Sequence, residues 1–290
     1  MRKLNDKIVS AIENGSLSGF LDLVEKSKGE LELEIRNNYV NIYYMGGCIY
    51  KIVSRKAGCE VIFNKKYFEH NEKLSKKLRD KKNELLKEKP IDELKEVMRS
   101  WFVEHPNLER QCQQKIVSEN NWCEHSDYTI LDIEYAKYEK EGRYRFDMIA
   151  INSEGNLSLI ELKYGLGSVN GNAGILKHID DIMKFLNSEY YKKDFYSEME
   201  GIMEQKKKWR IAPSANEKPF SKKAKAEIIL LFINDGKQSD CEFKKEIKEI
   251  LKVELKDKET GRIKVGLLSQ DEYMLKAKNI VSLKDFSKQK

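Results

Sequence analysis

The stretch that decides the fold is residues 143–165, RYRFDMIAINSEGNLSLIELKYG. Both of its ends are rich in large apolar and β-branched residues, which favour strands. Its middle, residues 152–156, is polar and contains a glycine, as the turns of hairpins do. The stretch therefore predicts a β-hairpin with strands at 143–151 and 157–164.

The expected pairing of this hairpin brings two carboxylates together. If Ile151 pairs with Leu157 across the turn, Asp147 lies directly opposite Glu161, with Cβ atoms about 4.5–5.5 Å apart. Lys163 follows Glu161 by two positions and points to the same face of the sheet. A slip of one residue would move every side chain to the other face, so the prediction depends on this register.

Such a pair of carboxylates on mostly apolar strands needs a cation or a proton between its members. Mg²⁺ suits the position because it prefers carboxylate oxygens, a carbonyl and water. A bound metal lowers the pKa of its water and neutralises phosphoryl oxygens. Lys163 beside it can orient the attacking water or stabilise charge on a phosphate. Together, these groups are the ones that metal-dependent hydrolysis of a phosphodiester bond requires.

Asp147 and the triplet Glu161-Leu162-Lys163 resemble the signature of the PD-(D/E)xK nuclease superfamily, which shares the fold of type II restriction endonucleases. In that superfamily an Asp lies on one strand and a Glu-x-Lys on the next strand of a hairpin. The resemblance implies a mixed central β-sheet flanked by helices, and metal-dependent cleavage of DNA or, less often, RNA. It places Mg²⁺ or Mn²⁺ on Asp147, Glu161 and the backbone carbonyl of Leu162.

The resemblance covers roughly residues 105–235, and Phe146 stands where the superfamily's name has proline. Many members carry a further Glu on a helix before the sheet, for which the candidates, in order, are Glu109, Glu119 and Glu134 on the preceding strand. Their helix after the hairpin often carries a polar residue that faces the site. Three residues of this chain are available there, namely Lys177, His178 and Asp181. Tyr164 begins a glycine-rich loop, 164–172, that we expect near the substrate.

Glu-x-Lys spacing alone has little specificity in this chain, because Glu and Lys are abundant. It recurs at Glu93, Glu246 and Glu254. Glu93 and Glu246 lie in helical patterns, and Glu254 has no acidic partner on a hairpin. Glu161 alone combines a strand, an Asp in register and a following helix.

Elements of both kinds flank the hairpin and define the class of the fold. The expected elements are a strand at 128–137, an amphipathic helix at 173–186, a buried strand at 227–234, a helix at 242–251 and a strand at 263–268. Two more helices are expected at 91–102 and from Pro106 to about 120. This pattern is α/β, or α+β over the whole chain, and we expect the nuclease-like domain to span residues 91–290.

Residues 1–90 predict an N-terminal α+β appendage. Two helices are expected within residues 1–28, a small antiparallel sheet within 30–63, and a lysine-rich helix at 66–89. The alternation in the sheet predicts one buried and one open face. Four tyrosines could stack nucleobases on the open face, namely Tyr39, Tyr43, Tyr44 and Tyr50.

The composition narrows the class of protein further. The chain has 290 residues, with 54 Lys and Arg against 48 Asp and Glu, so its net charge is +6. Basic stretches at 65–95 and 192–225 can follow a phosphate backbone or form solvated helix faces. The five cysteines form no CxxC pair, which argues against a zinc site. The chain has no apolar run of membrane-spanning length and no apolar core of a signal peptide, so we expect a cytoplasmic protein away from membranes.

Nucleic acid, with DNA preferred, is therefore the expected partner. A homodimer is a further expectation, because restriction-like nucleases often dimerise. Two alternatives stay open. Asp147, Glu161 and Lys163 could form a buried ion-pair cluster in an inactive relative, which binds nucleic acid on a degenerate nuclease fold, or the fold could serve an interaction protein.

Overall fold

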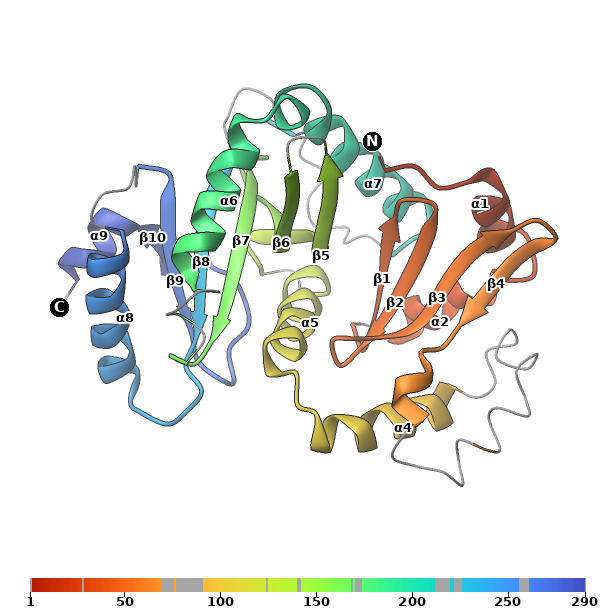
Figure 1. Ribbon diagram of the computed structural model, residues 1–290, viewed down its shortest axis with the longest axis horizontal. Helices are drawn as coiled ribbons and strands as arrows, with labels where there is room; N and C mark the ends of the chain where they lie inside the picture. The colour runs from red at the N-terminus through yellow and green to blue at the C-terminus, as the bar shows by residue number, and fades with distance from the viewer. Residues whose placement is uncertain are drawn as a thin grey trace. The chain divides into compact units, whose positions relative to one another are not determined.

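The computed structural model describes residues 2–27, 29–68, 76, 91–123, 125–139, 142–167, 169, 174–211, 220–221, 226–255 and 261–289. They form a mixed α+β protein with two β-sheets (Figure 1). The chain divides into two compact units. Unit 1 holds Met1–Gln114 and Ile202–Pro213, and unit 2 holds Lys115–Gly201 and Ser214–Lys290.

Unit 1 is built on a four-stranded antiparallel sheet in the order β1-β2-β3-β4. Its strands are β1 (Leu31–Arg36), β2 (Tyr39–Tyr44), β3 (Gly47–Arg55) and β4 (Gly58–Ile62). Two helices lie against this sheet: α1 (Asp6–Glu13) contacts β3 and β4, and α2 (Gly19–Ser27) contacts β1. The predicted pair of helices and the predicted antiparallel sheet are therefore both present.

The division into units follows a hydrophobic core and does not fall near residue 90. The 3-10 helix η1 (Lys65–Phe68) and α4 (Ile91–Glu104) pack into the core of unit 1, where Leu94, Val97 and Met98 are fully buried. Trp209 and Ile211 belong to the same core, although they follow most of the strands of unit 2 in the sequence. Apolar burial thus assigns α4 and residues 202–213 to unit 1.

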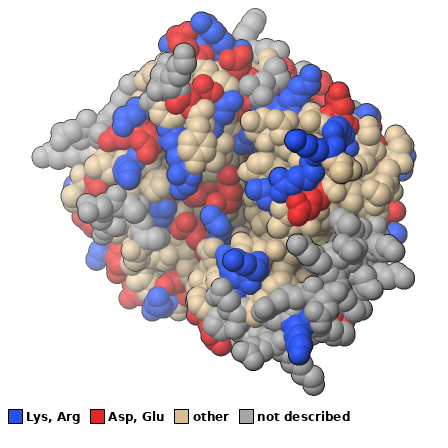
Figure 2. Space-filling model, turned by 45° about the vertical axis from the view of Figure 1, so that its right-hand side comes forward, with Lys and Arg blue, Asp and Glu red and all other residues tan. Residues whose placement is uncertain are grey.

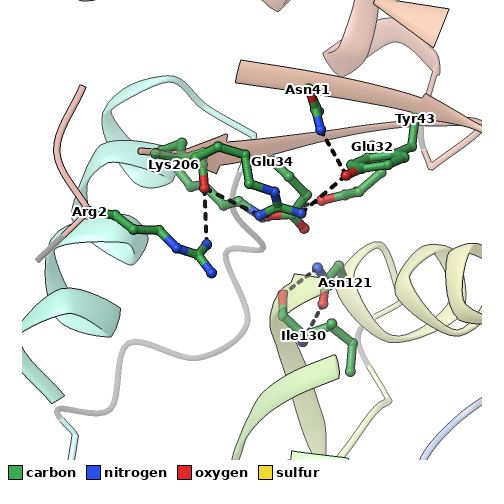
Figure 3. Close-up of polar contacts among 10 residues, drawn as sticks. Arg2, Glu32, Glu34, Asn41, Tyr43, Asn121, Ile130 and Lys206 are labelled. Atoms are coloured by element: carbon green, nitrogen blue, oxygen red, sulfur yellow. Dashed lines mark hydrogen bonds and ion pairs between the residues drawn. The ribbon is translucent and has the colours of Figure 1, made fainter. Parts of the chain in front are cut away.

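The expected open face of the first sheet is wrong for β1, whose residues are all buried. On the face away from the apolar core, the carboxylates of Glu32 and Glu34 meet the ammonium group of Lys206 at 3.4 and 3.1 Å (Figure 3). The guanidinium group of Arg36 lies 3.7 Å from Glu34. Opposite charges cover this face, because buried charges need partners.

The prediction that four tyrosines stack nucleobases fails for three of them. Tyr43, Tyr44 and Tyr50 are buried, so their rings are not available to a ligand. Tyr39 is half-buried, and the ammonium group of Lys51 lies 4.3 Å from the centre of its ring.

Unit 2 is built on a six-stranded sheet in the order β10-β9-β8-β7-β6-β5. Its strands are β5 (Tyr128–Glu139), β6 (Gly142–Asn152), β7 (Leu157–Tyr164), β8 (Glu227–Ile233), β9 (Ile263–Leu268) and β10 (Ile280–Ser282). β5, β6 and β7 are antiparallel, whereas β7, β8 and β9 run parallel. The five strands predicted after residue 127 are confirmed, and β10 is an additional one.

Unit 2 also holds α6 (Ile175–Asn187), α8 (Asp240–Glu254), α9 (Leu283–Lys288) and the short 3-10 helix η4 (Ala277–Asn279). The residues of α5 (Leu108–Asn121) belong to unit 1 as far as Gln114 and to unit 2 from Lys115. α6 packs against β6 and β7 (Figure 1). A π-helix, η3 (Tyr191–Phe195), leads into α7 (Tyr196–Lys208). α7 and α9 were not predicted: α7 lies in the basic stretch 192–225, which was interpreted by its charge alone, and α9 is short.

Asn121 closes the outer edge of β5, which is the last strand of its sheet. Its side-chain amide donates to the carbonyl of Ile130 at 2.9 Å, and its side-chain oxygen accepts from the Ile130 N–H at 2.8 Å (Figure 3). These bonds satisfy backbone groups that an edge strand otherwise leaves unpaired.

The lysine-rich helix predicted at 66–89 falls mostly outside the described residues, and its first residues belong to η1. Within the described part of the chain, no helix has both the length and the apolar character needed to span a membrane.

Candidate functional site

The hairpin of β6 and β7 has the register that the sequence predicts. Ile151 pairs with Leu157. The turn is fixed by Asn152, whose side-chain oxygen accepts from the N–H groups of Glu154 and Asn156, each at 3.0 Å. Gly155 adopts a left-handed backbone with φ of 83°, which glycine does at no steric cost.

Asp147 and Glu161 lie one position beyond the last backbone pair, Met148 with Ile160. At this position the side chain of Asp147, rather than the backbone of β6, forms the hydrogen bond to β7. Its Oδ2 accepts the N–H of Leu162 at 2.8 Å. The carboxyl groups of Asp147 and Glu161 are within hydrogen-bonding reach of each other. The predicted meeting of these two carboxylates is therefore present in the structure.

Two basic side chains converge on the same oxygen of Glu161. Nζ of Lys163 lies 2.7 Å from Oε1, and Nδ1 of His178 lies 3.1 Å from it. Lys163 comes from the same strand, and His178 comes from the first turns of α6, which packs on that strand. The side chains of Glu161 and Lys163 are buried, whereas that of His178 is 33% exposed. The cluster is thus reachable from solvent on the side of His178.

The surroundings of Glu161 leave its negative charge only partly compensated. Burial raises the pKa of the Glu161 carboxyl above its ordinary value of 4.5, and the charge of Glu134 raises it further. Lys163 and the hydrogen bond with Asp147 act in the opposite direction but do not cancel the effect of burial. A raised carboxyl pKa means that the site favours a proton, or an added cation, beside this group.

Glu134 is a further acidic residue whose charge acts on Glu161. Its neighbours on β5 pair with β6 as Ile133 with Met148 and Tyr135 with Phe146, which puts Glu134 opposite Asp147. Its φ is 51°, a left-handed conformation that is uncommon outside glycine and costs about 1–3 kcal/mol. Of the three acidic candidates before the hairpin, Glu134 is the one whose charge acts on Glu161 in unit 2.

The other two acidic candidates lie elsewhere. Glu109 is in the first turn of α5 and belongs to unit 1, so its role stays a prediction. Glu119 belongs to unit 2, where its Oε2 accepts the backbone N–H of Tyr273 at 3.0 Å. This bond holds the segment before η4, so Glu119 has a structural role.

The remaining candidates around the hairpin have other surroundings. Lys177 is exposed on α6, and Asp181 forms an ion pair with Lys184 at 3.6 Å. The hydroxyl of Tyr164 accepts a hydrogen bond from Gln270 at 3.3 Å. Contact with substrate by Lys177 or Tyr164 stays a prediction.

Comparison of the chain with models of protein families, with curated proteins and with solved structures finds no match. Its function has to be argued from the residues of the site.

The donor set fits a small divalent cation with few protein ligands. Among the described residues, no three side chains of His, Cys, Asp or Glu converge as a ready-made metal cluster. Mg²⁺ needs fewer, because it is typically held by one or two carboxylates and several waters. Asp147 and Glu161 are such a pair, and the raised pKa of buried Glu161 is the observation that fits an added cation there.

The basic stretch at 192–225 is largely neutralised, wherever it is described. Its lysines form ion pairs with Glu189, with Glu13 and with the two carboxylates of β1; they are Lys192, Lys193, Lys206 and Lys208. Figure 2 shows acidic and basic side chains interspersed over the face that it displays. The described lysines of this stretch are therefore held in ion pairs within the protein, which does not favour a phosphate-binding surface.

The buried charges of unit 1 differ from what the sequence predicts. Residues 31–36 read LELEIR, and this alternation predicts a solvated polar face. The presence of both acidic and basic residues on that face, Glu32, Glu34 and Arg36, was the available sign that it could be covered by a partner. The partner itself, Lys206, is 174 residues from Glu32 in the sequence and left no local signal.

Proposed function

We propose that this protein is a metal-dependent nuclease that hydrolyses phosphodiester bonds, with DNA preferred over RNA. The observation that carries the proposal is the convergence of Asp147, Glu161 and Lys163 at one point of the β6–β7 hairpin. Two carboxylates and a lysine at this spacing are also what the resemblance to the PD-(D/E)xK superfamily implies.

The arrangement of unit 2 supports a restriction-endonuclease-like fold. Three antiparallel strands, β5 to β7, are followed by α6 and then by β8, which adds to the sheet in parallel. The result is a mixed sheet with the candidate site on adjoining strands. Fold alone does not decide function, so the argument rests on the side chains.

Asp147 and Glu161, with the carbonyl of Leu162, would hold Mg²⁺ or Mn²⁺. A cation bound there would supply an activated water and neutralise charge on the phosphate. Glu134, opposite Asp147, adds negative charge that favours a divalent over a monovalent ion.

Lys163 holds a positive charge beside the carboxylates in a buried setting, where electrostatic interactions are stronger than in water. From this position it can orient a water molecule or stabilise charge that develops on a phosphate oxygen. His178 donates toward the same oxygen of Glu161 and holds that carboxylate in place. We assign His178 the role of a positioning residue.

The test is cleavage of a mixed panel of single-stranded and duplex DNA and RNA by the purified chain with Mg²⁺ or Mn²⁺. We expect cleavage that is abolished by EDTA and by Lys163→Ala. Lys264→Ala is the matched control, because Lys264 also lies on a strand and pairs with a glutamate, Glu227, at 2.7 Å. Full cleavage by Lys163→Ala, or none by the wild type, would refute the proposal.

A second candidate function is metal-independent binding of nucleic acid by a degenerate site. It is favoured by one observation: Lys163 and His178 already satisfy the same oxygen of Glu161, as in a closed ion-pair cluster. Salt-dependent binding without turnover in any metal would support this candidate.

A further inference from the structure

Unit 1 carries a column of basic and aromatic side chains that the candidate site does not use. The ammonium group of Lys66, on η1, lies 4.6 Å from the centre of the Trp101 ring on α4 and 4.8 Å from that of Tyr67. Trp101 stacks on His105 with ring centres 4.5 Å apart and planes inclined by 12°. We call Lys66, Trp101 and His105 the aromatic column.

A second cation lies near Lys66 in this column. The pKa of the Lys66 ammonium is lowered, first by burial and then by the nearby charge of Arg110. Arg110 is exposed on α5, within the same unit. A cation that is partly desolvated and repelled by a second cation gains stability when an anion arrives. A phosphate group is such an anion.

The ring at the end of the column is presented to solvent. His105 is exposed, whereas Trp101 beneath it is half-buried and anchored edge-on against Tyr67 at 5.2 Å. A flat ring that is already supported from below is suited to stacking with a further planar group. Nucleobases in a single strand offer such a face, whereas those of a duplex are stacked on one another.

We propose that the aromatic column, with Arg110, is a binding surface for single-stranded nucleic acid. A base stacks on His105, and a neighbouring phosphate lies against Lys66 and Arg110. This proposal goes beyond the hydrolysis proposed for unit 2, because it names the state of the strand that the protein binds and does not depend on cleavage.

The test measures binding of a fluorescein-labelled 12-nucleotide DNA by anisotropy in EDTA, so that no cleavage intervenes, over a series of salt concentrations. Lys66→Gln should weaken binding and reduce the slope of log affinity against log salt by about 0.7, because one phosphate contact is lost. His105→Ala should weaken binding roughly tenfold with no change of slope, because stacking is not ionic. Lys65→Gln, the exposed neighbour of Lys66, is the matched control.

A third variant tests the sign of the local charge. Glu104 is exposed and precedes His105 in the chain, so Glu104→Gln should tighten binding. Melting curves of all variants establish that each is folded, and the exposed His105 keeps the test valid even if Lys66→Gln is unstable.

The proposal is overturned if Lys66→Gln and His105→Ala bind the oligonucleotide as the wild type does, or if a duplex of the same length binds equally well and responds to the same variants. Loss of binding in these variants together with an absence of cleavage by the wild type would sustain this proposal while refuting the proposed hydrolysis. Cleavage with unchanged binding would do the reverse.

Discussion

Two groups of carboxylates in this protein lie on β-strands beside a lysine and differ in their surroundings. On β1 of unit 1, Glu32 and Glu34 lie on a single strand and face Lys206, which is 4% exposed. On the hairpin of unit 2, Asp147 and Glu161 come from two strands, and Asp147 is half-buried rather than buried. Both groups contain acids and a lysine within about 4 Å.

The two groups differ in how far nearby cations compensate the negative charge of the carboxylates. At β1, Arg36 joins Lys206, so two cations within 4 Å serve two carboxylates in a covered position. At the hairpin, Glu134 joins the acids, and the pKa of Glu161 stays raised despite Lys163. In a balanced, buried group each charge depends on its partners, so that removal of one partner destabilises the fold, whereas a group with surplus negative charge and access to solvent is suited to bind a cation. The two groups therefore predict opposite responses to mutation.

Asp147→Asn should separate the two groups most clearly. We expect the initial rate of cleavage to fall by about 10³-fold or more, which corresponds to about 4 kcal/mol of transition-state stabilisation. The free energy of unfolding should stay about the same, because the side-chain oxygen of Asn can still accept the N–H of Leu162. Rates on the best substrate of the panel, with urea unfolding of the same preparation, measure both. If the Asp147→Asn variant cleaves at the rate of the wild type, the carboxylates of the hairpin have a structural role and not a catalytic one.

Lys206→Met should have the opposite profile. Removal of this cation leaves Glu32 and Glu34 buried with less compensation, and we expect a loss of about 3–5 kcal/mol in the free energy of unfolding. The rate per folded molecule should be unchanged. Lys207→Met, the exposed neighbour on α7, serves as the control. Additional replacement of both glutamates by leucine should restore much of the stability; a Lys206→Met protein as stable as the wild type would contradict the structural assignment.

His178→Asn is expected to lower kcat by roughly tenfold, or about 1.4 kcal/mol, with little change in KM, because it loosens the Glu161 carboxylate without removing it. Lys177→Ala is the comparison, since Lys177 is the exposed residue beside His178 on α6. Steady-state kinetics with the same substrate measures the effect. Equal rates for the two variants would show that His178 does not position the site.

Glu13→Gln tests the smallest of these effects. The pKa of the Glu13 carboxyl is lowered, chiefly by the hydrogen bond from Lys208, and Gln205 and Trp209 also donate to it. We expect a loss of less than about 1 kcal/mol, because Lys208 is largely exposed. A lowered pKa gives stability that is complete above the ordinary value of 4.5 and is lost as the pH falls through the folded-state value. The difference between variant and wild type, followed by Trp fluorescence in urea, should therefore be full at pH 7 and shrink below pH 4.5; a constant difference would contradict it.

The sequence predicted the hairpin well because its determinants are local. A five-residue turn with Asn152 and Gly155 fixes the register, and the register fixes which side chains share a face. Asp147, Glu161 and Lys163 could be named for that reason. His178 was among three candidates on its helix, and only packing against β7 distinguishes it from its neighbours.

The remaining features depend on contacts between distant segments. The left-handed backbone at Glu134 has no signal in its own sequence, and Glu109 came first because the resemblance implies a Glu on a helix before the sheet. Lys206 pairs with the carboxylates of β1, and Trp209 and Ile211 pack into the hydrophobic core of unit 1. All three residues come from the segment 202–213. Patterns within a window of a dozen residues contain no information on such pairs.

The return of residues 202–213 to unit 1 bears on how the chain folds during its synthesis. A ribosome delivers Met1–Gln114 first and must then add the 87 residues from Lys115 to Gly201 before Lys206 and Trp209 appear. At 5–20 residues per second this takes roughly 4–17 s. Throughout that interval the nascent sheet of unit 1 has Arg36 but lacks Lys206, which pairs with both Glu32 and Glu34, and its last core residues are not yet made. Unit 1 therefore starts to be made before unit 2 but cannot be completed until most of the first half of unit 2 has been translated.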